Sequence, residues 1–214
     1  MTEGPPIRDA ATVIVLRETG AGPAVLMGQR GASAAFMPSK YVFPGGAVDA
    51  GDGDVTFARP LAEPVRAALS RRAATAPEAL AGAALRELAE ETGQVIAGAG
   101  PGCGWPGFAD RAPDAQPLRF VFRAITPPAR PRRFDARFFL ATADALVTDP
   151  DDFSAAEDEL SHLHWVPLAE ARALDMPFIT EVVLAEIAAI SEGTDVPGVP
   201  FFDNSGAAST FHRL

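Results

Sequence analysis

Three carboxylates crowd one short stretch of the chain, ALRELAEETGQ at residues 84–94. Glu87 stands three and four positions before Glu90 and Glu91, so on a helix all three side chains leave from neighbouring positions on one side. Like charges at this spacing disfavour a helix by about 0.2–0.5 kcal/mol per pair, and a cation beside them would offset that cost. We therefore expect a cationic group beside these carboxylates, and hard metal cations are among the groups that carboxylate oxygens bind.

A metal-free alternative uses Arg86, the one basic residue in this stretch. In that interpretation the helix is exposed, Arg86 pairs with Glu90 at i, i+4, and the other carboxylates are solvated. The cluster would then be a surface feature without chemistry.

A helix is needed to hold these carboxylates in place. Proline suits the first turn of a helix, and glycine suits the left-handed residue that follows the last turn. We therefore predict a helix from just after Pro77 to Thr92, ended by Gly93. Its buried stripe is predicted to consist of Leu80, Ala84, Leu85 and Leu88. The three glutamates then face a groove or solvent.

The rest of the chain alternates between strand and helix patterns. Strands are predicted at residues 11–18, 23–30, 41–48, 118–127 and 133–142. Helices are predicted at 64–75 and 177–190, and a strand leading into a short helix at 163–174. Residues 97–117 are rich in glycine and proline and are predicted to be a loop. Strands mixed with helices indicate an α/β layer fold.

Composition narrows the class of protein. The net charge of the 214 residues is −10, which argues against nucleic-acid coat proteins and membrane-surface binders as classes. No apolar run reaches the about 18 residues of a membrane span, the N-terminus lacks the pattern of a signal peptide, and a single cysteine suits a reducing compartment. We therefore expect a cytoplasmic protein with neither nucleic acid nor membrane as a partner.

Arginine is concentrated between residues 119 and 137. Six arginines stand there against a single acid, Asp135. Because arginine pairs bidentately with phosphate, the segment is expected to receive an anionic ligand. The alternative is a solvated strand pair with exposed arginines.

The acidic stretch resembles part of a known motif. Residues 86–93, RELAEETG, are similar to the second half of the Nudix box, GX5EX7REUXEEXGU, in which U is apolar. FPGGAVDAGD at residues 43–52 is similar to its opening, with Gly46 as the leading glycine and Asp52 in place of the expected glutamate. Residues 53–85 stand where the box has seven residues, so the resemblance implies an insertion that splits the box. The final apolar position is also changed, to Gln94.

The resemblance implies a fold and a set of ligands. The expected fold is a Nudix α/β/α sandwich with a central mixed sheet, as one domain over residues 1–214. A helical insertion is expected at about 53–80 and an irregular C-terminal tail at about 192–214. By the same resemblance, Glu87, Glu90 and Glu91 contact Mg²⁺ or Mn²⁺, the carbonyl of Gly46 adds a ligand, and Arg86 orients its neighbouring glutamate. Glycines at 45 and 46 fit this role, since a backbone without a Cβ can approach a metal closely. In the acidic loop before residue 160, Glu157 or Glu159 is a candidate base or distal ligand.

A second resemblance concerns the substrate. VLMGQRGASAAFMPSKYVFPGG at residues 25–46 resembles the signature of coenzyme A diphosphatase-like Nudix proteins of the peroxisomal type, with Arg30 matching and with departures at Ala35 and Ser39. Residues 131–142 resemble a segment of the same subgroup. This resemblance implies that substrate is bound by Arg30, Lys40, Phe43, Gly45, Arg132 and Arg133. The inserted helix is expected to form one wall of the pocket.

The predicted function follows from both resemblances. It is a metal-dependent hydrolase that cleaves the P–O–P bond of a nucleoside diphosphate linked to another group, with coenzyme A or an acyl derivative as the first substrate to test. Two alternatives stay open, an ADP-ribose or dinucleotide diphosphatase and a nucleotide-binding regulator without turnover. The sequence itself does not indicate an oligomeric state, and the resemblance leaves a homodimer open, because Nudix proteins of this size are often dimers.

Overall fold

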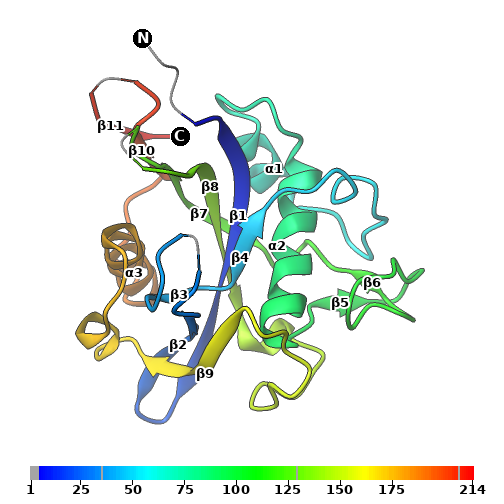
Figure 1. Cartoon of the computed structure of the whole chain (residues 1–214). Helices are drawn as coiled ribbons and strands as arrows, with labels where there is room; N and C mark the ends of the chain where they lie inside the picture. Colours follow the sequence, from blue (N-terminus) through cyan, green and yellow to red (C-terminus); the bar gives the residue numbers. More distant parts are fainter. Residues whose placement is uncertain (1–4, 35, 129, 207) are drawn as a thin grey trace.

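The centre of the protein is a mixed β-sheet with helices on both faces (Figure 1). The structure is a computed structural model that describes residues 5–34, 36–128, 130–206 and 208–214. Within them the sheet consists of β1 (Ile7–Thr19), β2 (Gly22–Arg30), β3 (Tyr41–Val42), β4 (Gly45–Ala47), β7 (Arg119–Ile125), β8 (Arg133–Thr142), β9 (Leu160–Pro167), β10 (Pro200–Asp203) and β11 (Thr210–Arg213). The helices are α1 (Glu63–Leu69), α2 (Pro77–Thr92) and α3 (Phe178–Ser191). The α/β class predicted from the sequence is confirmed.

The sheet is organised around β1. This strand pairs parallel with β8, from Ile7 opposite Arg133 onward, and antiparallel with both β2 and β4. The residues from Val13 to Val15 are fully buried, as expected of a strand covered on both faces. Pairing with β1 also fixes the glycine turn, because Gly45 lies opposite Thr12 in the antiparallel register.

Side chains alternate along β1 and contribute to two separate hydrophobic cores. Val13 and Val15 belong to the core that contains the apolar stripe of α2. Ile14 and Leu16 belong to the core that contains the buried residues of α3. Each face of the sheet is therefore packed against its own helix.

The helix α2 begins and ends where the sequence predicts. Pro77 occupies its first turn, and Gly93 follows its last turn with φ 71°, a left-handed conformation that glycine adopts without strain. Every residue of the predicted stripe, from Leu80 to Leu88, is fully buried. None of the helices in the described ranges is long and apolar enough to cross a bilayer.

The prediction of an irregular C-terminal tail is wrong. β10 pairs parallel with β7, and β11 pairs antiparallel with β10 at the edge of the sheet. Both strands have only four residues and follow a segment with Pro197 and Gly198, so no local alternation indicates them. They are ordered by pairing, of β10 with the distant strand β7 and of β11 with β10. The predicted loop at 97–117 likewise contains a short pair, β5 (Ala97–Gly98) with β6 (Ala112–Pro113).

The segment between the glycine turn and α2 is held against the sheet. Its helix α1 is shorter than predicted and ends at Leu69. After the helix, the carbonyls of Arg71 and Arg72 accept hydrogen bonds of 3.2 and 3.0 Å from Arg123 on β7. Arg123 is itself paired bidentately with Asp135 on β8, at 2.8 and 2.7 Å. This buried arginine therefore fastens the segment to two strands on the α2 side of the sheet.

Candidate active site

The two halves of the split motif lie against each other. The backbone N–H of Gly45 donates a 2.7 Å hydrogen bond to Oε2 of Glu91 on α2. The carbonyl of Ala47 accepts a 3.1 Å hydrogen bond from Nη2 of Arg86. The glycine turn and the acidic helix, far apart in the sequence, thus form one site.

Asp52 holds Arg86 by a bidentate ion pair. Nε and Nη2 of Arg86 donate to the two carboxylate oxygens of Asp52 at 2.8 and 3.0 Å. Asp52 is 1% exposed and also accepts a 2.7 Å hydrogen bond from the backbone N–H of Asp49. The shorter aspartate reaches the arginine because the chain before α2 passes close to the helix, where the carbonyl of Asp52 leaves no room for a Cβ on Gly82.

Arg86 also bridges two of the glutamates. Its Nη1 donates to Glu87 at 2.9 Å and to Glu90 at 2.8 Å. Burial disfavours the charged guanidinium, but its hydrogen bonds to Asp52 and the nearby carboxylates outweigh that effect, so the pKa of Arg86 is raised. The pairing of Arg86 with Glu90 is therefore present, whereas the exposed helix of the metal-free alternative is not, because Arg86 and Glu91 are both buried.

Two of the three glutamates have raised pKa values. Burial raises the pKa of Glu91 to about 8, against the stabilising hydrogen bond from Gly45. Burial raises the pKa of Glu87 to about 7, although the charge and hydrogen bond of Arg86 oppose the shift. A cation would stabilise both carboxylates in their charged forms, and such shifts are typical of functional sites.

The free oxygens of the cluster indicate where a cation fits. Oε1 of Glu91 is buried without a hydrogen-bond partner. Arg86 engages one oxygen each of Glu87 and Glu90 and leaves the other without a partner among the described residues. A Cβ on Gly46 would lie 2.3 Å from Oε1 of Glu87, so the missing side chain opens space beside that carboxylate. Oxygen donors around a glycine suit Mg²⁺ or Mn²⁺ chemically.

The glutamates are arranged by their protein partners. Across the described ranges, no three His, Cys, Asp or Glu side chains already converge in the geometry of a metal centre. Arg86 draws Glu87 and Glu90 toward itself, and Gly45 holds Glu91. Binding of a cation would therefore require the free oxygens to turn inward by side-chain rotation.

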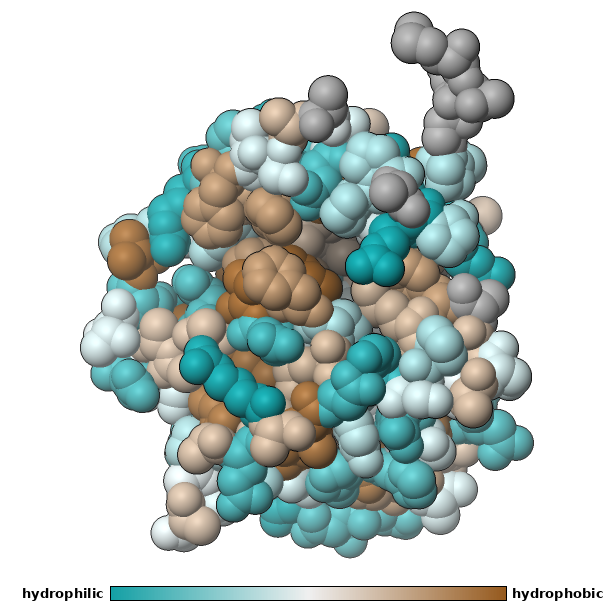
Figure 2. Space-filling model, turned by 60° about the vertical axis from the view of Figure 1, so that its left-hand side comes forward, coloured by the Kyte–Doolittle hydropathy of each residue, from teal (hydrophilic) through white to brown (hydrophobic). Residues whose placement is uncertain are grey.

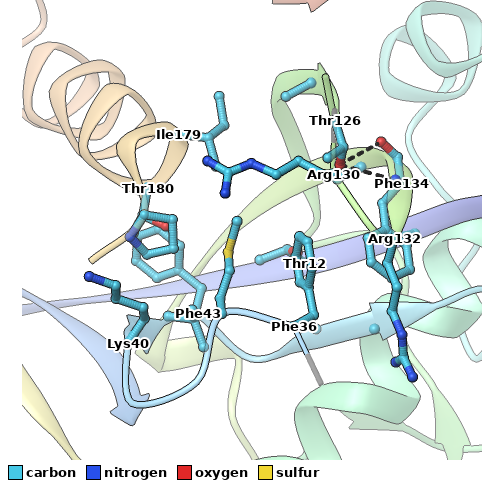
Figure 3. Close-up of a pocket in the computed structure, with 18 of the residues that line it drawn as sticks. Thr12, Phe36, Lys40, Phe43, Thr126, Arg130, Arg132, Phe134, Ile179 and Thr180 are labelled. Carbon is cyan, nitrogen blue, oxygen red and sulfur yellow. Dashed lines mark hydrogen bonds between the residues drawn. The ribbon is translucent and has the colours of Figure 1, made fainter. Parts of the chain in front are cut away.

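A cavity of about 780 Å³ opens beside this cluster on the α3 side of the sheet (Figure 3). Of the residues predicted to act in the site, its walls include Glu87, Gly46, Glu159, Arg30, Lys40, Phe43, Gly45 and Arg132. Glu159 accepts a 2.8 Å hydrogen bond from Arg30, and Lys40 is paired with Asp175. Glu157 is fixed differently, since its backbone N–H donates to the carbonyl of Glu90 at 2.8 Å.

Two predictions about the walls do not fit the structure. Arg133 does not line the cavity; it is buried and donates to the carbonyls of Thr126 and Asn204 at 3.0 and 2.8 Å. Its neighbour Arg132, which stands just before β8, is exposed and is among the residues that line the cavity. The segment before α2 forms none of the described wall, because it is fastened to the opposite face of the sheet.

Several wall residues were not predicted. They come from the loop after β2, the ends of β7 and β8, the start of α3 and the C-terminal strand β10, and include Phe36, Phe134, Ile179 and Phe202. Phe36 and Phe134 contact each other edge to face with ring centroids 5.3 Å apart. In the sequence these wall residues are recognisable only as apolar residues near the end of a strand or the start of a helix. Residues of the hydrophobic core share this feature, so it does not distinguish a cavity wall from the core.

Comparison with known proteins assigns the family. The fold and the arginine-bridged acidic helix beside a glycine turn are those of a Nudix-type hydrolase. A family model described as NUDIX domain matches residues 74–186, which is more than half of the chain. The chain therefore belongs to the Nudix family. No curated protein matches it.

Solved structures support this assignment. A NUDIX hydrolase from Alicyclobacillus acidocaldarius is 28% identical with a TM-score of 0.66, over 91% of this chain and 99% of that chain. An Ap4A hydrolase from C. elegans, solved as a binary complex, is 16% identical with a TM-score of 0.53, over 87% and 99% of the two chains. The NUDIX domain of Shewanella oneidensis NrtR, complexed with ADP ribose, is 13% identical with a TM-score of 0.53, over 86% and 88%. The last two show a shared fold alone.

Proposed function

We propose that this Nudix-type hydrolase depends on Mg²⁺ or Mn²⁺ and cleaves the diphosphate bond of a nucleoside diphosphate linked to another group. The observation that carries the proposal is the carboxylate cluster beside the cavity, of which Glu87 lines the wall while Glu90 and Glu91 are not among the wall residues. Glu87 and the backbone of Gly46 both line that cavity, and Glu91 lies directly behind the glycine turn. A ligand in the cavity would thus reach the cluster.

The residues of the cluster have two roles, metal binding and the positioning of the metal ligands. Glu87, Glu90, Glu91 and the carbonyl of Gly46 would hold the metal, which when bound neutralises phosphate oxygens and makes a water more acidic. Arg86 fixes the orientation of Glu87 and Glu90, and Asp52 fixes Arg86. These pairs keep both glutamates beside the glycine turn, from where their free oxygens would turn toward the metal by side-chain rotation.

A carboxylate must accept the proton of the attacking water. As the water oxygen bonds to one phosphorus, the bridging P–O bond breaks and the second phosphate leaves. Glu159 is the proposed acceptor, because it lines the cavity and lies close enough to Glu87 and Glu91 for its charge to raise the pKa of both. Its ion pair with Arg30 keeps the carboxylate in place.

Cationic side chains in the walls would bind the phosphates. Arg30, Lys40 and Arg132 all line the cavity, and Arg130 from the same turn as Arg132 extends across it toward Ile179 (Figure 3). Arginine binds phosphate bidentately, and the strong salt dependence of such contacts gives a simple check. Coenzyme A or an acyl derivative is the proposed substrate, with the box split by an insertion as in the resembling subgroup.

The test is a substrate panel with Mg²⁺ or Mn²⁺ that includes coenzyme A, acyl-coenzyme A, ADP-ribose and dinucleoside polyphosphates. The expected products are adenosine 3′,5′-bisphosphate from coenzyme A, or AMP from ADP-ribose. Glu90→Gln should lower the rate by about 100-fold or more without unfolding the protein. Glu78→Gln is the matched control, because Glu78 lies on the same helix but pairs with Arg66 away from the cavity. Tight nucleotide binding without turnover of any substrate would instead support a regulator.

A further inference from the structure

The first turn of α3 has backbone donors that the protein does not use. Pro177 stands at the N-cap and makes no side-chain hydrogen bond to the helix. The N–H groups of Thr180 and Glu181 donate to the carbonyl of Pro177 at 2.9 and 3.3 Å. Those of Phe178 and Ile179 have no acceptor among the described residues. Free N–H groups at the start of a helix, together with the helix dipole, favour an anion.

A buried hydroxyl beside these donors also lacks a partner. Thr180 is 4% exposed, yet its Oγ1 makes no hydrogen bond within the part of the chain that the structure describes. Buried hydroxyls in folded proteins are usually hydrogen-bonded, because an unpaired one costs free energy. Thr180 lines the cavity together with Phe178 and Ile179, so a ligand in the cavity can supply the missing partner (Figure 3).

Positive charge lies around the same turn. The side chain of Arg130 extends toward Ile179, and its guanidinium is paired with no carboxylate of the described residues (Figure 3). Lys40 lines the cavity as well, and its pair with Asp175 neutralises the acid that precedes the helix. Glu181, the acid of the first turn, is not among the residues that line the cavity. An anion at this end of the cavity therefore meets donors and cations.

The same cavity connects this turn with the carboxylate cluster. Glu87 and the first turn of α3 both line it, although α2 and α3 cover opposite faces of the sheet (Figure 1). Hydrophilic as well as hydrophobic residues border the hollow on this side of the molecule (Figure 2). The volume of about 780 Å³ lies within the about 300–1,000 Å³ of pockets for drug-sized ligands, so one ligand can reach both places.

We propose that the first turn of α3 binds a phosphate monoester of the substrate, separate from the diphosphate that is cleaved. The N–H groups of Phe178 and Ile179 and the hydroxyl of Thr180 would donate to its oxygens. The guanidinium of Arg130 would add charge-assisted hydrogen bonds, which are the stronger kind. The inference rests on the proposed function for the position of the diphosphate. It narrows the substrates to those that carry a further phosphate, as coenzyme A does on its ribose and ADP-ribose does not.

The first test compares two substrates that differ only in this phosphate, coenzyme A and dephospho-coenzyme A. With Mn²⁺ and the full chain, kcat/KM should be about tenfold or more higher for coenzyme A. The difference should appear in KM, because the additional phosphate lies away from the reacting atoms. Equal KM and kcat/KM for the two substrates would overturn the inference and leave the diphosphatase activity intact.

Calorimetry in a chelating buffer keeps the two proposals separate, because nothing is hydrolysed without the metal. The ligand pairs are coenzyme A with dephospho-coenzyme A, and NADP⁺ with NAD⁺, and each pair differs by one phosphate monoester. Tighter binding of the phosphorylated member supports the inference even if no substrate is cleaved, and that lack of cleavage would count only against the proposed function. Equal affinity within both pairs, or no binding of any of these ligands, overturns the inference.

Variants at the start of α3 and in the opposite wall locate the effect. Thr180→Val removes the hydroxyl and keeps the shape of the side chain, and Arg130→Gln removes the charge of an exposed residue, so both variants should fold. Each should reduce the preference for coenzyme A over dephospho-coenzyme A by about three- to tenfold. Thr180→Ser keeps the hydroxyl and should keep the preference, which separates hydrogen bonding from a packing role of Thr180.

Arg172→Gln is the matched control for Arg130→Gln. Arg172 is exposed in the turn before α3 and does not line the cavity, so its loss should leave the preference at the wild-type value. If Thr180→Val and Arg130→Gln weaken the binding of both ligands equally, the turn contacts a part that the two ligands share, and the inference is overturned. The wild-type preference in both variants would overturn it as well.

Discussion

The two faces of the central sheet are built in opposite ways. On the α2 face, side chains such as Val13 and Leu85 are fully buried, and the charged groups among them are paired, Arg86 with Asp52 and Arg123 with Asp135. On the α3 face, a cavity of about 780 Å³ separates part of the sheet from its covering elements. β8 shows both at once, because Arg137 is buried on the first face while Phe138 lines the cavity on the second.

The difference shows how the fold separates two requirements. Groups that carry out hydrolysis must be held rigidly, and a packed helix with buried ion pairs does so. Groups that recognise a substrate need space, and space costs packing energy. Because the rigid hydrolytic groups and the substrate cavity lie on different faces of the sheet, the cavity can vary without loss of the rigid support.

The largest effect is expected on the packed face, at Arg86. Arg86→Met leaves the buried carboxylate of Asp52 without its cation, and breaking a buried pair in this way costs about 3–5 kcal/mol. Urea unfolding measures the loss. Arg66→Met is the control, because its pair with Glu78 is exposed and pairs of that kind contribute about 0–1 kcal/mol. Similar losses of unfolding free energy in both variants would mean that the buried Arg86–Asp52 pair contributes no more stability than the exposed Arg66–Glu78 pair.

Matched truncations of core residues compare the two faces directly. Leu85→Ala on α2 removes a fully buried side chain and should cost about 2–5 kcal/mol of unfolding free energy. Ile179→Ala on α3 removes a side chain that is only partly buried and borders the cavity, so the cost should stay near about 1 kcal/mol. The contrast fails if the two variants lose the same stability.

Substitutions at the adjacent glycines Gly45 and Gly46 should affect stability and activity differently. A Cβ on Gly45 would lie 2.5 Å from the carbonyl of Ala11 and 2.6 Å from the Cα of Thr12, both backbone atoms that cannot give way. Gly45→Ala should therefore destabilise the fold, by about 1–3 kcal/mol as in other overpacked sites. A Cβ on Gly46 meets the carboxylate of Glu87 instead.

Because that carboxylate can rotate away, Gly46→Ala should leave most of the stability and lose most of the activity. Thermal unfolding and turnover of the best substrate, measured on both variants, give the two readouts. An active, folded Gly46→Ala variant would show that Glu87 does not need its present position.

Protonation of the buried glutamates gives the packed face a pH signature. The pKa of Glu91 rises to about 8 and that of Glu87 to about 7, from an ordinary value of 4.5. Between pH 4.5 and the raised pKa of each glutamate, the folded state keeps a proton that the unfolded state has lost. The stabilisation is therefore complete below the unfolded pKa and is lost as the pH rises through the folded values.

In a chelating buffer, the melting temperature should thus be lower at about pH 8.5 than at about pH 5.5. Glu91→Gln removes one of the two groups and should reduce this difference. The same pH dependence in wild type and variant would assign the effect to other residues.

Local sequence patterns were sufficient to predict much of the packed face. Pro77 and Gly93 set the ends of α2, and an apolar stripe at helical spacing identified its buried side. The motif halves around Gly46 and Arg86 were also recognisable, because their chemistry needs particular residue types. The burial of Arg86 could not be predicted, because no local pattern tells a buried arginine from an exposed one.

The cavity face could not be predicted in the same way. Its walls come from segments distant in sequence, and β10 is a strand because it pairs with β7 and β11 rather than because of a local pattern. The neighbours Arg132 and Arg133 illustrate the limit. Arg132 lines the cavity and Arg133, the first residue of β8, binds backbone carbonyls, a difference that depends on tertiary contacts which the sequence does not show.

The glutamates on α2 and the glycine turn are proposed to bind a divalent cation. Titration of Mn²⁺, followed by the electron paramagnetic resonance of the free ion, tests it without any substrate. We expect wild type and Glu78→Gln to bind Mn²⁺ alike, and Glu87→Gln and Glu91→Gln to bind at least about tenfold more weakly while still folded. Equal Mn²⁺ affinity in all four proteins would show that these glutamates do not bind the cation.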